Sequence, residues 1–302
     1  MTIDEALSAL LSGDVSALAR LVDRDPSLVR ARVASDAGHY CGYFHGATLL
    51  HHVAGNPTIA PLPPGIVDVA RLLLDRGAEV DAATLAGPSQ PTDIGWTTLG
   101  LAATSLAARE AGHQTALLEL LVARGADVNA RDGGALIGAL YYREDAAAAW
   151  LVRHGARTDL VAAAGLGRID LMERHVLPSG ALADDARTLA DYGLRPGAVR
   201  APADVLSLAL VYAVRSGRVD AIRWLVDRGA DPRAPAPFDH GATPLHWAAI
   251  DGQREAAELL LSLGADPGVR DASFRGTARG WATHGGHLAL AELFPPDPTP
   301  RA

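Results

Sequence analysis

The sequence predicts an all-α protein built from about eight stacked helix–turn–helix repeats. Residues 241–269 (GATPLHWAAIDGQREAAELLLSLGADPGV) align without a gap with residues 206–234 (LSLALVYAVRSGRVDAIRWLVDRGADPRA), at an offset of about 35 residues. A period of this length is typical of stacked supersecondary units, none of which can bury its apolar face alone. Composition agrees, because 49% hydrophobic residues with only 5% aromatic residues suits thin helical layers.

Each repeat ends on an apolar triplet, two variable residues and Gly-Ala. This ending occurs at 72–82, 120–130, 150–160, 224–234 and 259–269. The opening is strongest at Thr243-Pro244-Leu245-His246. Degenerate openings start at Thr48, Thr97, Gly134, Thr158, Leu208 and Thr277, and residues 3–22 fit the same template from about Asp4.

The best-formed repeat, at 243–264, explains why such a segment folds into two helices. The Thr243 hydroxyl can cap the first helix, and Pro244 follows at a position where its missing N–H costs nothing. Gly252 is expected to end the first helix in the left-handed region, and Gly264 to end the second. Between them, apolar residues recur at helical spacing, namely Ala256, Leu259, Leu260 and Leu263.

These motifs resemble the ankyrin repeat family. The matching features are TPLHWAA (243–249), the turn at Gly252, ELLLSLGADP (258–267) and Asn129 within GADVNA. The resemblance covers nearly the whole chain. It implies helix pairs joined by hairpin-like finger loops, stacked into a curved solenoid that binds other proteins on its concave face.

We therefore expect one elongated domain over 1–302. It would begin with a degenerate repeat at 3–31 and end in a short Pro-rich tail at 295–302. Four insertions interrupt it, at 55–66, 82–95, 106–114 and 176–204. We expect these to be, in order, a long inter-helix turn, an expanded hairpin before Trp96, a helix extension, and a loop whose residues 184–193 could form a short helix. Insertions in repeat proteins often lie on the binding face, but surface loops also tolerate neutral changes in length.

Charge and cysteine content narrow the class of partner and the compartment. The net charge of −8 argues against nonspecific binding of nucleic acid or acidic membranes, and all 27 basic residues are arginine, which excludes a Schiff-base lysine. The single cysteine, Cys41, rules out an internal disulfide and suits a reducing compartment. With no signal-peptide pattern and no membrane-length apolar run, we expect a cytoplasmic monomer without a cofactor.

The finger loops carry the candidate partner-binding residues, because aromatic and arginine side chains make good interface anchors. These residues are Tyr40, Tyr43, Phe44, His45, Trp96, Phe238, Asp239, His240, Phe274 and Arg275. Tyr43, Trp96 and Phe238 are expected to be partly exposed, and an acidic chain with arginines among these aromatics suits a partner of mixed or basic charge. The alternative is that some of these side chains only close gaps between adjacent fingers.

Other aromatic residues are predicted to be structural. Trp150 and Trp224 share the position of Leu259 on the second helix and are expected in the core. Tyr212, Trp247 and Trp281 share a position in the first helix and are expected to pack between repeats. His51 and His246 occupy the TPLH histidine position, where the family resemblance implies a structural hydrogen bond.

No specific catalytic constellation is present: the sequence has no G-x-S-x-G, H-E-x-x-H, P-loop or C-x-x-C. We therefore expect a non-enzymatic protein–protein interaction module without a cofactor or metal, whose concave face and fingers bind an unidentified protein. The alternative is a metal- or small-molecule-binding site, or an enzymatic one, near 39–52. There, His39, Cys41, His45, His51 and His52 could hold zinc or supply a nucleophile, although no carboxylate partner is assigned.

Overall fold

The computed structural model describes residues 2–33, 44–55, 61–85, 95–186, 201–235 and 239–296. Across these residues the chain forms helices and isolated β-bridges, with no extended strand. The predicted all-α repeat fold is therefore confirmed. The chain divides into two compact units, residues 1–157 and 158–302, which we call the N-terminal half and the C-terminal half.

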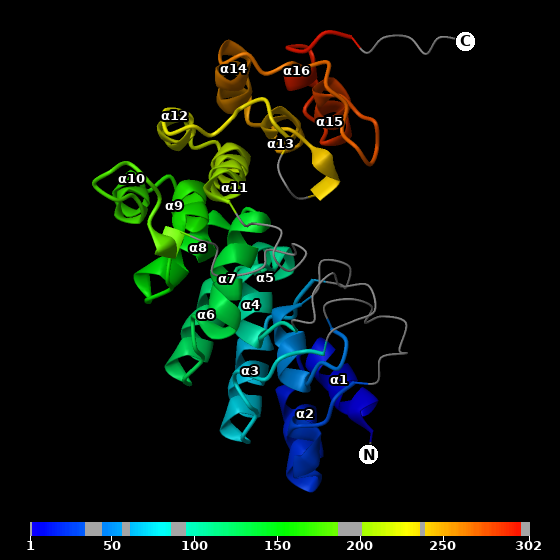
Figure 1. Ribbon diagram of the computed structural model, residues 1–302. Coiled ribbons are helices and arrows are strands. Elements are labelled where there is room, and N and C mark those ends of the chain that lie inside the picture. Colours follow the sequence, from blue (N-terminus) through cyan, green and yellow to red (C-terminus); the bar gives the residue numbers. More distant parts are fainter. Residues whose placement is uncertain are drawn as a thin grey trace. The chain divides into compact units, whose positions relative to one another are not determined.

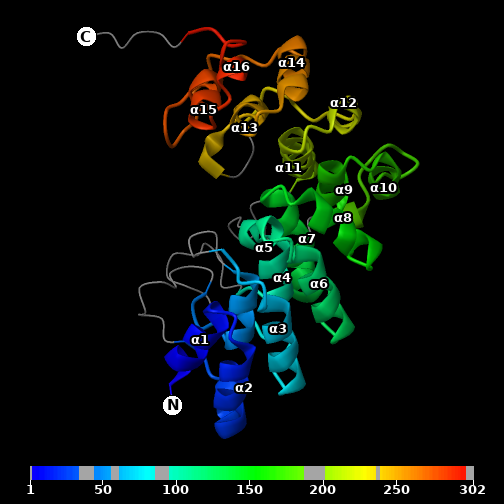
Figure 2. The same cartoon turned by 180° about the vertical axis from the view of Figure 1, so that it is seen from behind.

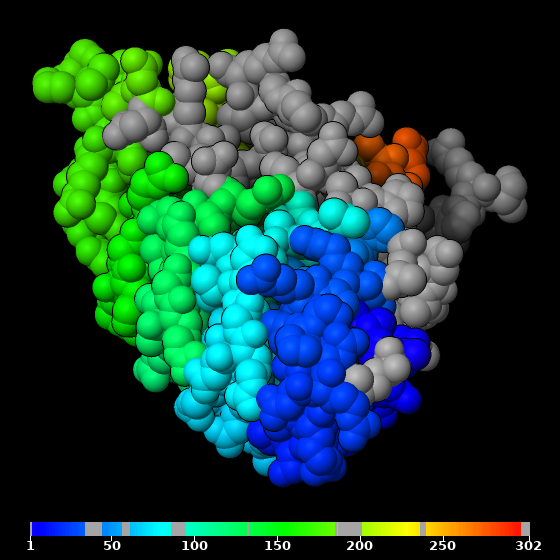
Figure 3. Space-filling model, turned by 90° about the horizontal axis from the view of Figure 1, so that it is seen from below, coloured from blue at the N-terminus to red at the C-terminus, as the bar shows by residue number. Residues whose placement is uncertain are grey.

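The N-terminal half contains four helix pairs that follow one another in chain order (Figure 1). Figure 3 shows the surface of this half, coloured in the same order from blue through cyan to green. Its elements are α1 (Ile3–Leu11), α2 (Val15–Arg24), the 3-10 helices η1 (Pro26–Val29) and η2 (Leu49–Ala54), α3 (Ile66–Asp75), α4 (Thr98–Ala103), α5 (Leu106–Glu110), α6 (Gln114–Ala123), α7 (Ala130–Tyr141) and α8 (Asp145–Arg153). The pairs are α1–α2, η2–α3, α4–α6 and α7–α8.

The C-terminal half also contains four helix pairs (Figures 1 and 2). Its elements are α9 (Leu160–Leu166), α10 (Ile169–Met172), η3 (Glu173–His175), η4 (Asp184–Ala186), α11 (Pro202–Arg215), α12 (Val219–Val226), η5 (Asp239–Gly241), α13 (Pro244–Ile250), α14 (Arg254–Ser262), α15 (Ala278–His284) and α16 (Leu288–Ala291). The first helices α9, α11, α13 and α15 pack successively on one another. Counted over the described residues, the two halves give the eight repeats that the sequence predicts.

The Gly-Ala endings share one geometry. In all five copies the glycine has a φ between +86° and +95°, and the following alanine N–H donates at 3.0 Å to the carbonyl five residues earlier. A Cβ at any of these glycines would meet nothing within 4 Å, so the backbone conformation, and not crowding, requires glycine here. The members are Gly77, Gly125, Gly155, Gly229 and Gly264.

The core lies between the helix pairs, as the sequence predicts. Leu225 and Leu260 are fully buried. The five aromatic residues predicted to be structural are also buried, namely Trp150, Tyr212, Trp224, Trp247 and Trp281.

Neighbouring repeats are joined by polar contacts as well as by the core. At the turn between the two helices, a side chain reaches back to a carbonyl at the end of the preceding repeat's first helix. The Ser105 hydroxyl donates to Ala54 at 2.6 Å, Arg218 Nε to Gly165 at 3.2 Å, and Gln253 Nε2 to Arg215 at 3.0 Å. Each contact satisfies a carbonyl that the helix end leaves without an intrahelical partner.

Two of the insertions behave as expected where they are described. Helix α3 begins at Ile66, directly after the Pro-rich turn. The ends of the 82–95 insertion pair as a hairpin, since Ala83 and Thr97 form an antiparallel bridge and the Thr84 N–H donates to the Trp96 carbonyl at 2.9 Å. Residues 56–60 and 86–94 lie outside the described positions.

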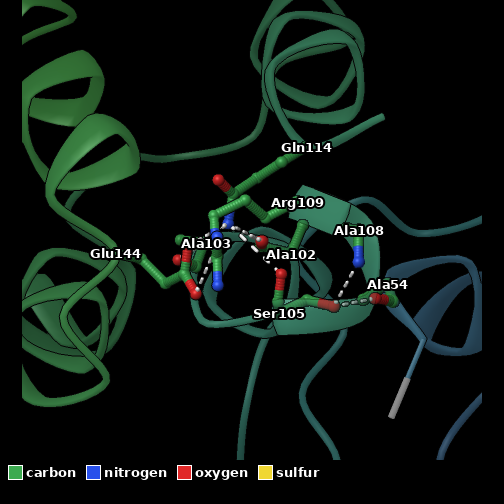
Figure 4. Close-up of polar contacts among 8 residues, drawn as sticks. All are labelled: Ala54, Ala102, Ala103, Ser105, Ala108, Arg109, Gln114 and Glu144. Atoms are coloured by element: carbon green, nitrogen blue, oxygen red, sulfur yellow. Dashed lines mark hydrogen bonds and ion pairs between the residues drawn. The ribbon is translucent and has the colours of Figure 1, made fainter. Parts of the chain in front are cut away.

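The other two insertions differ from the expectation. Residues 106–114 do not extend a helix: α4 ends at Ala103, and the Ser105 hydroxyl caps the separate helix α5 by accepting the Ala108 N–H at 3.0 Å (Figure 4). Helix α11 begins at Pro202, so the repeat expected to open at Leu208 starts within the supposed insertion. Of the helix considered at 184–193, the described part is the single turn η4.

Candidate functional site

The finger loops precede the first helix of each repeat. Two of them contain the same four residues, His-Gly-Ala-Thr, at 45–48 and 240–243. Each is followed three residues after the threonine by a histidine, His51 or His246, which links its own helix to the next finger.

The His51 ring makes its contacts through both nitrogens. The Thr48 N–H donates to Nδ1 at 3.0 Å, and the Thr48 hydroxyl lies 2.8 Å from the same nitrogen. Because Nδ1 accepts, the ring proton lies on Nε2, which donates to the Ala82 carbonyl at 2.9 Å. His246 repeats this arrangement with Thr243 and with the Gly276 carbonyl, at 3.1 Å. Both histidines are therefore structural, as the sequence predicts.

Burial keeps the histidines of these repeats neutral. It lowers the pKa of His51 to about 4 and that of His52 to about 3, and it also lowers the pKa of His246. At neutral pH none of the three carries a charge that would repel the peptide dipoles around it.

The C-terminal finger, residues 270–277, is organised by a buried carboxylate. Asp271 accepts the backbone N–H groups of Ser273 at 2.9 Å, Phe274 at 2.6 Å and Gly276 at 2.8 Å. It also accepts the indole N–H of Trp281 at 3.0 Å. Burial raises the pKa of Asp271, but these hydrogen bonds outweigh burial, and the net effect lowers that pKa. A fixed turn with a charged acceptor at its centre is the result.

This finger presents an aromatic pair at the surface. Phe274 is 68% exposed, and its ring centroid lies 4.7 Å from that of His240 on the preceding finger. The two fingers are tied together, since the Ala272 N–H donates to the His240 carbonyl at 2.8 Å and His240 Nδ1 lies 3.1 Å from the Ser273 hydroxyl. Arg275 lies next to Phe274 and is exposed.

Two residues of this surface have a positive φ, which is unfavourable for residues other than glycine. His240 has a φ of +63° and Arg275 has a φ of +58°. Such residues persist only when their surroundings hold them in place. Here the hydrogen bonds to Asp271 on both sides of Arg275, and the bond to the His240 carbonyl, supply that restraint.

The N-terminal fingers bury one of the candidate residues. Phe44 is only 2% exposed and stacks on His52, with centroids 4.9 Å apart and an interplanar angle of 20°. Its predicted role as a partner contact is therefore corrected: Phe44 packs inside the repeat. His45 is partly exposed, and its carbonyl accepts the Leu85 N–H at 2.7 Å.

Trp96 is partly exposed, as predicted, and it packs over the backbone of two helices. A Cβ at Gly138 on α7 would lie 2.9 Å from the Trp96 ring, and one at Gly100 on α4 would lie 3.2 Å from it. Glycine at these positions lets the indole lie close to both helices. The ring therefore closes the gap between two repeats, which is the alternative that the sequence left open.

The remaining candidates fall outside the described positions. Tyr40, Tyr43 and Phe238 do so entirely, as do His39 and Cys41 of the alternative site, and of Asp239 only the backbone is described. Over the described residues, no group of three His, Cys, Asp or Glu side chains is placed to hold a metal ion.

Sequence reasoning missed a buried polar cluster in the N-terminal half (Figure 4). The Glu144 side chain is 4% exposed and lies 3.0 Å from Nε of Arg109 on α5. Gln114 Nε2 donates to Glu144 at 3.4 Å and to the Ala102 carbonyl at 3.2 Å. These contacts hold α5 against the next repeat, so the polar groups of the cluster are already engaged in structural interactions.

Sequence reasoning also missed the role of Asp271. The signal was present, because an aspartate that begins a short loop commonly accepts the N–H groups of the residues that follow.

Family models match two parts of the chain, and similar proteins are known. One family model, described as three copies of ankyrin repeats, matches residues 179–271, and a single ankyrin repeat matches 95–133. The crystal structure of the human ASB11 ankyrin repeat domain aligns with 97% of this chain and 99% of that chain, at a TM-score of 0.42 and 19% identity.

Curated relatives match shorter segments. The mouse ARF GTPase-activating protein GIT2 is 42% identical over 87 residues, which is 29% of this chain and 12% of that protein. The ankyrin repeat domain-containing protein oryK of Aspergillus oryzae is 38% identical over 84 residues, covering 28% of this chain and 12% of its own length. The matched region thus spans about an eighth of these relatives. The family models thus show ankyrin repeats at residues 95–133 and 179–271 of this chain.

Proposed function

We propose that this chain is non-catalytic and binds a protein partner through the fingers of its C-terminal half, with Phe274 as the anchor. Its ankyrin repeats indicate a protein–protein interaction module. The observation that carries the proposal is the 68% exposure of Phe274 on a finger whose backbone is held by the Asp271 carboxylate. A large aromatic side chain in such a position gains more from contact with a partner than from solvent.

The rigidity of the finger adds to this argument. Association costs free energy for every loop and side chain that must become ordered. In this finger the turn is already fixed by four hydrogen bonds to Asp271, so the free-energy cost of ordering it on binding is smaller. A preformed loop of this kind suits recognition of a partner.

We also propose the finer features expected from the sequence: a cytoplasmic monomer that binds neither nucleic acid nor membranes. The net charge of −8 supports the first exclusion. Separately, none of the helices among the described residues is long and apolar enough to cross a membrane. Of the described residues in the alternative site near 39–52, His51 uses both ring nitrogens for structural contacts.

Site-specific photo-crosslinking tests the proposal. A photoreactive phenylalanine analogue would replace Phe274 in the full chain and, as the matched control, Arg223, which is exposed on α12 of the same half. We expect one defined crosslinked partner from position 274 and none from position 223, and Phe274→Ala should abolish capture in an affinity purification. The same partner crosslinking only from position 223, or capture that Phe274→Ala leaves intact, would contradict the proposal.

A further inference from the structure

The C-terminal finger is positively charged although the chain is acidic. Between residues 270 and 277 the ionisable side chains are Arg270, Asp271 and Arg275. Asp271 is fully buried, whereas both arginines are exposed. The charge is counted over this finger alone, since the side chain of Asp239 in the neighbouring finger lies outside the described positions. The finger thus offers two positive groups to solvent and no negative one.

Several arginines of this half pair with carboxylates. Arg254 pairs with Glu258 at 3.0 Å, Arg168 with Asp170 at 2.6 Å and Arg233 with Asp231 at 3.1 Å. Arg270 instead donates to the Arg275 carbonyl at 2.7 Å. Among the described residues, no carboxylate lies within ion-pair distance of either finger arginine. An external anion could pair with these exposed guanidinium groups.

Local charge outweighs net charge at such a surface. Charges more than about 8–10 Å apart are largely screened at physiological ionic strength, so a contacting partner experiences mainly the finger itself. The net charge of −8 suggested a partner of mixed or basic charge. The charge of this finger favours the opposite sign, and the exposed Phe274 lies between Arg270 and Arg275 in the sequence.

We infer that the surface formed by Arg270, Phe274, Arg275 and His240 binds an acidic protein segment, in which one apolar side chain is flanked by carboxylates. The apolar side chain would contact Phe274 and the His240 ring, 4.7 Å away. The carboxylates would accept hydrogen bonds from the guanidinium groups, whose fork geometry matches them. This inference rests on the proposed function and specifies the chemistry of its partner.

Synthetic peptides test the inference directly. The probes are fluorescein-labelled 12-residue peptides with one central phenylalanine, flanked on each side by three glutamates or, in a matched set, by three lysines or three serines. Binding to the full chain is measured by fluorescence anisotropy at 50 and 300 mM NaCl. We expect the glutamate peptide to bind at least about tenfold more tightly than the lysine peptide at low salt, and the difference to shrink at high salt.

Variants separate charge from fold. Arg275→Gln should weaken binding of the glutamate peptide about tenfold while leaving the serine peptide and the melting temperature unchanged, because that exposed guanidinium forms no hydrogen bond or ion pair among the described residues. Arg223→Gln on α12 removes an equal charge from the same half and should have no effect. An equal loss from both variants would mean a general field effect and would overturn the inference.

The remaining outcomes distinguish this inference from the proposed function. If the lysine or serine peptide bound as tightly as the glutamate peptide, and Phe274→Ala abolished that binding, the finger would be a binding surface of different chemistry, and only the acidic-segment inference would fail. A 12-nucleotide oligothymidylate that bound more tightly than the glutamate peptide would overturn the inference in favour of a phosphate polymer. If crosslinking from position 274 failed as well, the proposed function itself would fall.

Discussion

The fingers that begin at His45 and at His240 share a sequence and a backbone, but the phenylalanine beside each of them differs in exposure. In each, the histidine carbonyl accepts an N–H from the next finger, at 2.7 Å from Leu85 and at 2.8 Å from Ala272. The glycine that follows has nearly the same φ in both, +61° and +60°. Yet Phe44, which directly precedes His45, is buried, whereas Phe274, on the 270–277 finger bonded to His240, stands in solvent.

The difference follows from register. Phe44 lies four residues before its threonine, Thr48, and stacks on His52, which lies four residues after it. Phe274 lies only three residues before Thr277, and Asp271 directs the turn so that its side chain points outward. The T-x-x-H element holds the fingers at His45 and His240, whereas the repeat after Phe274 has Gly280 in place of the histidine. We infer that one residue of register relative to the threonine decides whether the aromatic side chain joins the core or the surface.

The largest expected difference concerns these two phenylalanines. Phe44→Ala should lower the free energy of unfolding of the N-terminal half by about 3–5 kcal/mol, because it leaves a cavity beside His52. Phe274→Ala should change stability by less than about 0.5 kcal/mol, because it removes a mostly exposed side chain. Urea denaturation followed by circular dichroism measures both, and equal destabilisation would contradict the register argument.

The linking histidines should behave alike in the two halves. His51→Ala and His246→Ala each remove the acceptor for a threonine N–H and the donor to the next finger, so each should cost about 2–4 kcal/mol. His284→Ala, at an exposed helix end, is the control and should be nearly neutral. If only one of the two were destabilising, the fingers would not share one architecture.

Acid should affect the N-terminal half first. The pKa values of His51 and His52 fall to about 4 and about 3 in the folded state, against an ordinary value of 6.5. Between pH 6.5 and these values the unfolded chain binds protons that the folded chain does not, so the free energy of unfolding decreases as the pH falls. At about 1.4 kcal/mol per pKa unit, the loss by pH 4 is on the order of several kcal/mol.

A substitution at His52 tests the acid prediction. Leu101 occupies the equivalent place, four residues after Thr97, so His52→Leu should be accommodated. Hydrogen exchange of the full chain, corrected for intrinsic pH dependence, should show a smaller loss of protection of the N-terminal half from pH 7 to pH 5 in this variant. An unchanged loss would show that these histidines do not control acid stability. Ionised Asp271 contributes to the free energy of unfolding at pH values above its ordinary pKa of 3.8. This contribution is lost only as the pH falls through the lower pKa that Asp271 has in the folded state.

The smallest predicted effect concerns the turn at Asp271. Asp271→Asn removes a charged acceptor of four hydrogen bonds and should cost about 1–3 kcal/mol, with faster exchange of the Ser273, Phe274 and Gly276 amides. Asp266→Asn is the matched control, since Asp266 accepts only the Gly268 N–H in an exposed turn, at 2.8 Å. Equal effects of the two substitutions would mean that the finger is not held by Asp271.

The sequence predicted the repeats well because each depends on local chemistry. A glycine with positive φ ends each of the five Gly-Ala helices, and the threonine and histidine of the opening motif bond within four residues of each other. Non-local contacts were less predictable. Ser105 caps α5 while donating to a carbonyl 51 residues away, so a helix extension was predicted where a separate helix forms. The burial of Phe44 depends on a stacking partner, and the charge of the C-terminal finger became visible only once Asp271 was seen to be buried.

The central claim is that the C-terminal finger is a preformed binding surface anchored by Phe274. The most direct measurement is the affinity of the crosslinked partner, once purified, for the parent chain and for Phe274→Ala, together with both melting temperatures. The account predicts a loss of about 30-fold or more in affinity at an unchanged melting temperature, as for other central aromatic anchors. An unchanged affinity would contradict it.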